Sequence, residues 1–455
     1  MTSRMHEPTG AEELRKAIFD YASKRLDYNP APLDGPLPQS ELDRLAGATI
    51  SEAGMGGLAA LKLFEQVLAP ATISTDHPGY LSFIPAAPSE ASSLFDLVVS
   101  ASSIYGGSWM EGAGAVFAEN QVLSLLAAEV GFPDGAGGVF VQGGTLGNLS
   151  ALVTAREQAR ARLGDKPFTI ICSSEAHSSI KAVAKVIGVS TTPADGGVSG
   201  SIGGAAVEAA LEEAKAAGLT PFAIVGTAGT TNFGIVDRLE ELAEIAEREQ
   251  LWFHIDGAYG LAGILAPELK QLFVGIERAD SFIVDPHKWL FAPFDACALV
   301  YRRPELAKGV FSQHGEYLEP INKNSEEWNP SDYAINLTRR ARGLPLWFSL
   351  AAHGVSAYRE AISANVELAS KIAAEIERRD YLRLVRKPQL SVVVFERVGW
   401  SQGDYNRWAE RLLQEQKALV LPSSLNGEPH TRFAIVNPLT SYELLIEILD
   451  SMEQS

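Results

Sequence analysis

The chain has 455 residues, 46% of them hydrophobic and 21% charged, which is enough to bury a large core and allows two or three domains. A formal net charge of −18, with no cluster of lysines and arginines, disfavours nucleic acid as a partner. No apolar stretch of about 18 residues predicts a membrane span, and Cys172 and Cys297 lack the C-x-x-C spacing of a metal or redox pair. We therefore expect a globular protein of the reducing cytoplasm.

The first 75 residues are expected to form an N-terminal helical segment. Helical patterning runs through residues 11–20 and 58–67, and a proline-rich stretch at 30–38 interrupts it. This pattern indicates an appendage of helices and not an independent domain.

Residues 76–355 are expected to form a large domain. From about residue 121 to 305, short runs rich in β-branched and aromatic residues alternate with helical patterns. Such alternation predicts an α/β fold with a mainly parallel sheet and helices on both of its faces. The expected strands are 138–141, 168–172, 222–225, 252–255, 282–284 and 298–301.

Residues 356–455 are expected to form a small α+β domain. A long amphipathic pattern through Glu377 leads to an apolar strand at 390–395, and a helix follows near 405–417. A further strand at 432–436 and a final helix complete the pattern.

Asp256 and Lys288 each follow a strand-like run in the predicted large domain. A carboxylate can keep the ring nitrogen of pyridoxal phosphate (PLP) protonated, while a lysine amine bonds to the aldehyde of that cofactor. Taken singly, the aspartate is as consistent with a turn and the lysine with a solvated surface. The pair and its flanking sequence indicate a PLP site.

His177 and Thr231 also follow predicted strands. Ligands of parallel sheets collect outside the carboxyl ends of the strands, so we expect these two side chains to lie near Asp256 and Lys288. From its own context alone, His177 is favoured as a partly buried residue of a helix-capping segment.

The segment Gln142-Gly-Gly-Thr-Leu-Gly-Asn148 follows a predicted strand and opens a helical run. Backbone N–H groups at such a position can hold a phosphate. The segment matches neither a P-loop nor a complete dinucleotide fingerprint, so a simple turn from strand to helix remains the alternative.

Two other chemistries are disfavoured by the pattern. His254 and Asp256 alternate onto one face of their strand, but no third and fourth metal ligands follow at suitable spacing, so we expect no metal and a His254 packed behind Asp256. A G-x-S-x-G nucleophile segment, typical of hydrolases on a similar sheet, is also missing from the sequence.

The segment Asp285-Pro-His-Lys-Trp-Leu290 resembles the lysine segment of the group II PLP-dependent amino-acid decarboxylases, and most of all that of their aromatic-amino-acid branch. Further resemblances occur in the family's order along most of the chain. They are His77-Pro-Gly-Tyr, Gly143-Gly-Thr, Glu175-Ala-His-Ser-Ser, Gly229-Thr-Thr, His254-Ile-Asp-Gly-Ala-Tyr and Thr338-Arg-Arg-Ala-Arg-Gly-Leu-Pro-Leu-Trp347.

This resemblance implies a fold type I PLP enzyme and assigns a role to each matching residue. Lys288 would form the Schiff base, Asp256 would pair with the pyridine nitrogen, and His177 would stack on the ring. Four more residues complete the implied contacts: Ala258 packs on the opposite face of the ring, Thr231 assists at the site, and Gly144 and Thr145 contact the phosphate together with His287.

The resemblance also implies a homodimer with shared active sites, in which the N-terminal helices clasp the partner subunit. The segment His314-Gly-Glu-Tyr-Leu-Glu-Pro320 resembles the family's catalytic loop, and Tyr317 holds the place of the tyrosine that returns a proton to Cα. A related branch with phenylalanine at that place releases an aldehyde, so Tyr317 favours decarboxylation to an amine.

The implied partner is a small-molecule substrate, an L-amino acid, with tyrosine, phenylalanine, tryptophan or dopa favoured. Ala86, Gly106 and Gly107 depart from the residues that line the aromatic pocket elsewhere in the family, and Thr338 falls at a variable place. Decarboxylation of aliphatic or acidic amino acids and aldehyde formation therefore remain alternatives. Asp285 replaces a common asparagine near the phosphate, where a second negative charge would be unfavourable unless it points away.

Overall fold

The computed structural model describes residues 10–313, 327–425 and 427–453 of the chain. Two compact units are present: one comprises Phe83–Phe395 and Phe433–Pro438, and the other comprises Met1–Ser82, Glu396–Arg432 and Leu439–Ser455. The division at residues 75 and 355 stays a prediction.

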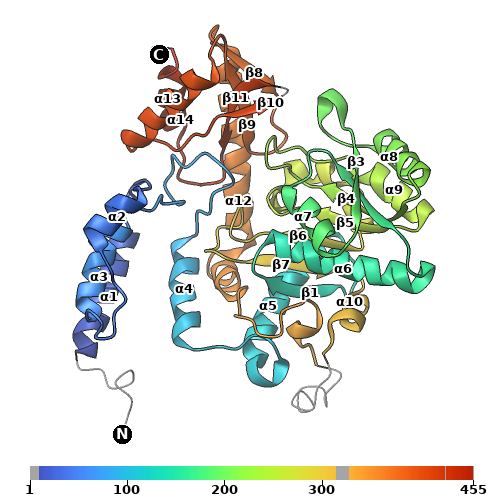
Figure 1. Ribbon diagram of the computed structural model, residues 1–455, viewed down its shortest axis with the longest axis horizontal. Helices are drawn as coiled ribbons and strands as arrows, with labels where there is room; N and C mark the ends of the chain where they lie inside the picture. The colour runs from blue at the N-terminus through green and yellow to red at the C-terminus, as the bar shows by residue number, and fades with distance from the viewer. Residues whose placement is uncertain (1–9, 314–326, 426, 454–455) are drawn as a thin grey trace. The chain divides into compact units, whose positions relative to one another are not determined.

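The larger unit is built on a seven-stranded sheet in the order β1-β7-β6-β5-β4-β2-β3 (Figure 1). All the pairs from β6 to β3 are parallel, whereas β7 is antiparallel to both of its neighbours. The predicted, mainly parallel sheet is confirmed. Its strands are β1 (Gly137–Val141), β2 (Phe168–Ser173), β3 (Ser190–Ala194), β4 (Thr220–Thr227), β5 (Trp252–Asp256), β6 (Ser281–Val284) and β7 (Cys297–Tyr301).

Strand β3 was not expected from the sequence. It lies at the edge of the sheet, where only one side needs a partner, and its residues Ser-Thr-Thr-Pro-Ala are polar or small. Proline is tolerated at such an edge because one row of N–H groups makes no ladder bonds.

Helices cover both faces of this sheet, as predicted. Val225 of β4 packs in a core cluster with residues of α6, whereas a side chain at the next position, Gly226, would meet Leu239 and Leu242 of α9. The helices of this unit are α4 (Glu90–Ala101), α5 (Trp109–Val130), α6 (Gly144–Leu163), α7 (Ser178–Val186), α8 (Gly204–Ala216), α9 (Leu239–Glu249), α10 (Pro304–Phe311) and α12 (Leu344–Glu377).

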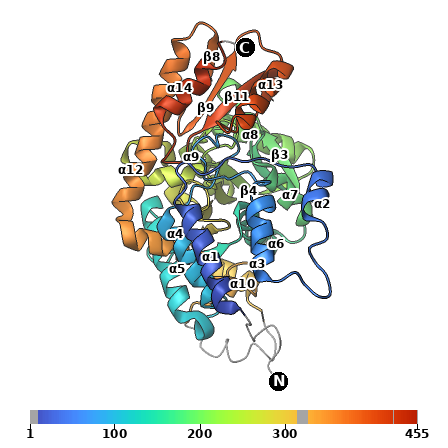
Figure 2. The same cartoon turned by 90° about the vertical axis from the view of Figure 1, so that its left-hand side faces the viewer.

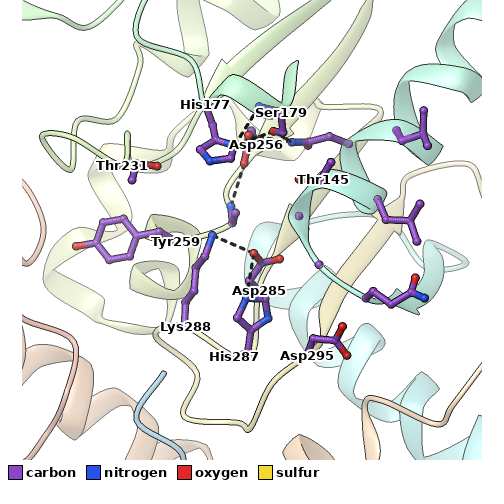
Figure 3. Close-up of a pocket in the computed structure, with 18 of the residues that line it drawn as sticks. Thr145, His177, Ser179, Thr231, Asp256, Tyr259, Asp285, His287, Lys288 and Asp295 are labelled. Carbon is purple, nitrogen blue, oxygen red and sulfur yellow. Dashed lines mark hydrogen bonds and ion pairs between the residues drawn. The ribbon is translucent and has the colours of Figure 1, made fainter. Parts of the chain in front are cut away.

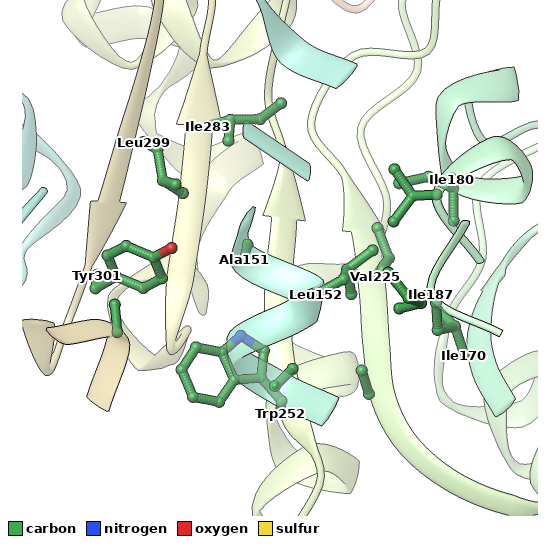
Figure 4. Close-up of a cluster of buried hydrophobic side chains, with 14 of the residues drawn as sticks. Ala151, Leu152, Ile170, Ile180, Ile187, Val225, Trp252, Ile283, Leu299 and Tyr301 are labelled. Atoms are coloured by element: carbon green, nitrogen blue, oxygen red, sulfur yellow. The ribbon is translucent and has the colours of Figure 1, made fainter. Parts of the chain in front are cut away.

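Helix α6 provides the central packing of one face (Figure 4). Ala151 and Leu152 are fully buried against apolar side chains from β2, β4, β6 and β7. Burial of one large aliphatic side chain contributes about 1.5–3 kcal/mol, so this row fixes α6 firmly on the sheet. The orientation of α6 matters because its first turn faces the candidate site.

Short helical turns connect the main elements. One turn is of the π type, η1 (Phe64–Leu68), and it continues directly from α3. The 3₁₀ turns are η2 (Gly197–Ser199), η3 (Gly260–Leu265), η4 (Pro267–Phe273), η5 (Ile276–Arg278) and η7 (Pro330–Asp332).

In the smaller unit, α1 (Ala11–Leu26) and α3 (Gly57–Leu63) pack side by side (Figure 2), and α2 (Gln39–Ala46) lies between them in the sequence. Within these described helices no residue is fully buried. The expected N-terminal helices are thus present, and they leave apolar side chains such as Phe19 exposed.

The C-terminal part of the chain contains a second, four-stranded sheet and two helices. The sheet has the order β10-β11-β9-β8, with β10 and β11 antiparallel. These elements are β8 (Leu382–Arg386), β9 (Val392–Arg397), α13 (Gln402–Gln414), β10 (Ser423–Leu425), β11 (Glu428–Ala434) and α14 (Tyr442–Asp450). The α+β character expected for this part of the chain is confirmed. Across the ranges that the structure covers, every helix is too short or too polar to cross a bilayer.

Candidate active site

A cavity of about 490 Å³ opens at the carboxyl ends of the parallel strands, entirely within the larger unit. Figure 3 shows His177, Asp256, Asp285 and Lys288 grouped around this space. The predicted cofactor contacts lie together along its wall: Gly144, Thr145, His177, Thr231, Asp256, Ala258, His287 and Lys288. The grouping arises because each residue follows a strand or opens a helix at the same edge of the sheet.

Asp256 is the last residue of β5, and its side chain is 5% exposed. Its Oδ2 accepts a hydrogen bond of 3.0 Å from Nδ2 of Asn148, and its Oδ1 accepts one of 3.2 Å from the backbone N–H of Ala258. Both oxygens therefore have a donor within the protein, and the carboxylate is held in one orientation.

Lys288 lies in the turn that follows β6, and its Nζ is 2.9 Å from Oδ2 of Asp285. Burial lowers the pKa of Lys288, but attraction to Asp285 and the hydrogen bond between them outweigh burial and raise the pKa above its usual value. The second oxygen of Asp285 is buried and has no hydrogen-bond partner among the described residues. The negative charge that the sequence marked as unfavourable is thus directed at the lysine.

The first turn of α6 borders the cavity at Gly144 and Thr145. A side chain at Gly147 would lie 2.8 Å from Sγ of Cys297 and from Cγ2 of Ile283, so glycine lets the helix approach the sheet closely. The first N–H groups of a helix carry partial positive charge and have no partners inside the helix. This end of the cavity suits an anionic group.

His177 is the N-cap residue of α7 and also lines the cavity. Its Nδ1 accepts a hydrogen bond of 3.2 Å from the N–H of Ser179 and lies 2.9 Å from the hydroxyl of Ser179. The two interpretations left open by the sequence are therefore compatible, because the cap fixes the ring while its other edge remains at the cavity.

His287 is fixed by the backbone of Ala296, whose carbonyl oxygen lies 2.7 Å from Nδ1 of the imidazole. Its Nε2 is 3.8 Å from Oδ2 of Asp285, so this nitrogen faces the lysine end of the cavity. Thr231 follows β4, and Ala258 follows Asp256 by two residues in the next turn.

Other expected residues are either outside the described part of the chain or away from this cavity. Tyr317 and its segment 314–320 lie outside the described residues. Among the described residues, Ala86, Gly106, Gly107 and Thr338 do not line this cavity. A side chain at residue 107 would lie 2.2 Å from the hydroxyl oxygen of Tyr105, whose ring takes up that space.

Sequence reasoning missed several residues of the site, and Asn148 is the most consequential. Its place at the end of the glycine-rich segment, one turn after Thr145, was a usable signal, since residues three apart share a helix face. Tyr259 and Asp295 also line the cavity, and Arg342 forms an ion pair with Asp295. Contacts between segments that are distant in sequence carry no local signal.

The described ranges contain no group of three or more His, Cys, Asp or Glu side chains arranged to hold a metal ion. His254 is fully buried and lies between Asn148 and Ser281, to which its ring nitrogens are hydrogen-bonded at 2.8 Å. It packs on the same strand face as Asp256, as the alternation predicted.

Comparison with known proteins identifies this constellation. The family model described as the pyridoxal-dependent decarboxylase conserved domain matches residues 49–398. The chain belongs to this family. An aromatic-L-amino-acid decarboxylase of Bacillus atrophaeus is 30% identical, with 96% of this chain and 94% of that protein covered. A 4-hydroxyphenylacetaldehyde synthase of Rhodiola rosea is 29% identical over 72% of this chain and 69% of that protein.

The fold is shared with solved structures of such proteins. The crystal structure of Oryza sativa TDC with PLP and tryptamine superposes with a TM-score of 0.92 at 23% identity, covering 100% of this chain and 99% of that one. The chain is therefore a fold type I, PLP-dependent amino-acid decarboxylase, a carboxy-lyase.

The residues around the cavity fit PLP. Oε1 of Gln142, Oγ1 of Thr227 and Oδ1 of Asp285 are buried at the cavity wall without a partner among the described residues. Buried polar atoms normally have partners, so these three indicate a polar ligand. A lysine, a carboxylate and a helix N-terminus around one space match the aldehyde, ring nitrogen and phosphate of PLP.

Proposed function

We propose that this decarboxylase acts on an aromatic L-amino acid and releases the amine and carbon dioxide. In this proposal Lys288 bonds to the cofactor, Asp256 pairs with its ring nitrogen, and His177 lies against the ring. Gly144, Thr145 and His287 hold the phosphate, while Thr231 and Ala258 border the ring. The single observation that carries the assignment is that Asp256 and Lys288 face one cavity from adjacent strand ends.

When bound, PLP supplies a conjugated ring that accepts the electron pair left on Cα as carbon dioxide departs. Asp256 holds a proton at the ring nitrogen, because a buried carboxylate with fixed orientation favours a positive charge beside it. His177 restricts the ring on one side, since its own ring is fixed by Ser179.

Asp285 has a separate role in this scheme. Asp285 would pair with the Nζ ammonium group of Lys288 whenever the lysine is not bonded to the cofactor, as it does at 2.9 Å in this structure. Tyr317 is proposed as the donor of the proton to Cα.

The aromatic substrate is favoured by the relatives of this chain. The relative from Bacillus atrophaeus is an aromatic-L-amino-acid decarboxylase and aligns with nearly the whole chain.

The test is a product assay of the PLP-loaded protein against all common L-amino acids and dopa, with amine and carbon dioxide measured together. We expect equimolar amine and carbon dioxide from one or more aromatic substrates. Amine from aliphatic or acidic substrates only would keep the chemistry and overturn the substrate proposal.

Aldehyde formation is the second candidate, favoured by the similarity to the aldehyde synthase of Rhodiola rosea. It predicts ammonia, peroxide and aldehyde in place of the amine. The proposed role of Tyr317 opposes it, and Tyr317→Phe should move the products toward aldehyde. An unchanged amine yield in this variant would contradict the role given to Tyr317.

We also propose that the protein is a homodimer with shared active sites. Helix α1 has no fully buried residue, and Phe19 on it is 51% exposed. On α5, Phe117 is 57% exposed. Large apolar side chains exposed on a helix surface support an interaction surface there. Sedimentation of the full chain at micromolar concentration should give twice the 48.8 kDa chain mass, and a monomer with full activity would refute the shared sites.

A further inference from the structure

Asn148 lies where two parts of the site meet. One amide N–H of its side chain donates to Oδ2 of Asp256 at 3.0 Å, and Nδ2 also donates to the hydroxyl of Ser179 at 3.1 Å. Ser179 in turn contacts Nδ1 of His177 at 2.9 Å. The Asn148 carboxamide thus contacts Asp256, which is proposed to pair with the ring nitrogen. It also contacts Ser179, which supports His177, the residue proposed to lie against the ring face.

A second chain of hydrogen bonds fixes Asn148 from behind. The indole N–H of Trp252 donates to Oγ of Ser281 at 2.9 Å, and Oγ lies 2.8 Å from Nδ1 of His254. Nε2 of His254 lies 2.8 Å from Oδ1 of Asn148. Trp252, His254 and Asp256 alternate along one face of β5, so the chain runs along the strand toward the cavity.

The donor and the acceptor of each hydrogen bond between Trp252 and Asp256 follow from the groups at the two ends of the series. An indole can only donate, and a carboxylate that is charged can only accept. Ser281 therefore accepts from Trp252 and donates to Nδ1 of His254. The proton of the imidazole is then on Nε2 and donates to Oδ1 of Asn148, whose Nδ2 donates to Asp256.

The surroundings support a neutral His254. Burial lowers the pKa of this imidazole to about 3, so it carries one ring proton at neutral pH. A single proton on Nε2 is what the bond to Asn148 requires. No charged donor is needed, and each polar atom between Trp252 and Asp256 has a hydrogen-bond partner in the required sense.

We propose that Asn148 is a positioning residue that orients Asp256 and, through Ser179, His177, and that Ser281 and His254 set the direction in which Asn148 donates. This inference rests on the proposed function, because it assigns the cause of the Asp256 and His177 geometry. Loss of the Asn148 donor makes the carboxylate a stronger proton acceptor. The proton shared with the ring nitrogen then shifts toward Asp256.

The test uses the protein loaded with PLP that carries ¹⁵N at the ring nitrogen, with the ¹⁵N chemical shift and the PLP dissociation constant as readouts. Asn148→Leu removes the amide at nearly constant volume. We expect its ¹⁵N shift to move toward that of neutral pyridine and its PLP affinity to fall roughly tenfold or more, the scale of one hydrogen bond to a charged group. Ser150→Ala, a buried change on the same helix, should alter neither readout.

His254 gives an independent pair of variants if Asn148→Leu does not fold. His254→Leu should move the ¹⁵N shift in the same direction. His254→Gln should restore much of the wild-type value, because its amide nitrogen can donate to Oδ1 of Asn148. If His254 had a purely structural role, His254→Leu and His254→Gln would give the same ¹⁵N shift.

Ser179→Ala separates the two arms of Asn148. It should weaken PLP binding through His177 while the ¹⁵N shift stays that of the wild type. Wild-type values in both Asn148→Leu and His254→Leu would overturn the inference alone. A neutral ring nitrogen in the wild-type protein would overturn the proposed role of Asp256, and this inference with it.

Discussion

Two aspartates at neighbouring strand ends face the same cavity and differ in how they are satisfied. Asp256, at the end of β5, accepts a hydrogen bond on each oxygen from a neutral donor. Asp285, just beyond β6, has one oxygen on the Lys288 ammonium and the other without a partner in the described structure. The first carboxylate is fixed before any ligand binds, whereas the second depends on a lysine that the cofactor also requires.

The largest loss of activity is expected on substitution of Lys288, which both the cofactor and Asp285 require. Lys288→Ala should lower amine production by about 10³-fold or more, because the covalent link to the cofactor is lost. The apoprotein should also be less stable by a few kcal/mol, because removal of one partner leaves a buried charge unpaired. Activity and urea unfolding measure the two effects.

Two controls separate these effects. Lys371 is an exposed lysine on α12, and Lys371→Ala should change neither amine production nor stability. Adding Asp285→Asn to Lys288→Ala should recover stability without recovering activity. Equal stability of the two variants would show that Asp285 does not depend on Lys288.

Asp256→Asn tests the carboxylate that is already fixed. The change keeps the shape of the side chain and removes its charge, so kcat should fall about 10²- to 10³-fold, the scale of losing one preorganised polar group. The folded structure should persist, and steady-state kinetics with circular dichroism checks both points. A kcat within threefold of the wild type would contradict the role of Asp256 at the ring nitrogen.

Asp285→Asn tests the carboxylate that depends on the lysine. Asp285 raises the pKa of Lys288, so its neutralisation should lower that pKa, and the neutral amine that captures PLP should exist at lower pH. The pH profile for PLP capture, followed by visible absorbance of the lysine-bound cofactor, should move toward acid. A shift toward alkali, or an unmoved profile, would count against the ion pair.

We expect the smallest effect from Gly147→Ala. The effect should act mainly through α6, which carries Asn148, the hydrogen-bond donor to Asp256. The new methyl group would press on Cys297 and Ile283 at 2.8 Å, which displaces α6 and costs about 1–3 kcal/mol. Because Asn148 is adjacent, PLP binding should weaken too. Gly147→Ala with Cys297→Ala should recover part of the stability, and Gly309→Ala, which meets no atom within 4 Å, should not destabilise the protein.

The sequence predicted the parts of the site that follow from local pattern. Apolar runs ended at Asp256 and near Lys288, and the parallel sheet then brings those ends together. The pattern did not reveal that Asn148 reaches Asp256 or that Asp285 turns toward Lys288, since both depend on side-chain orientation across neighbouring elements. Strand β3 was missed for a related reason, because an edge strand needs little apolar sequence.

The most direct test of the account is to reduce the PLP-loaded protein with borohydride, digest it and locate the modified residue by mass spectrometry. The account predicts a pyridoxyl group on Lys288 of the wild-type protein and none on any other lysine. A modification on another lysine, or none in protein that carries stoichiometric cofactor, would contradict the assignment of this cavity as the PLP site.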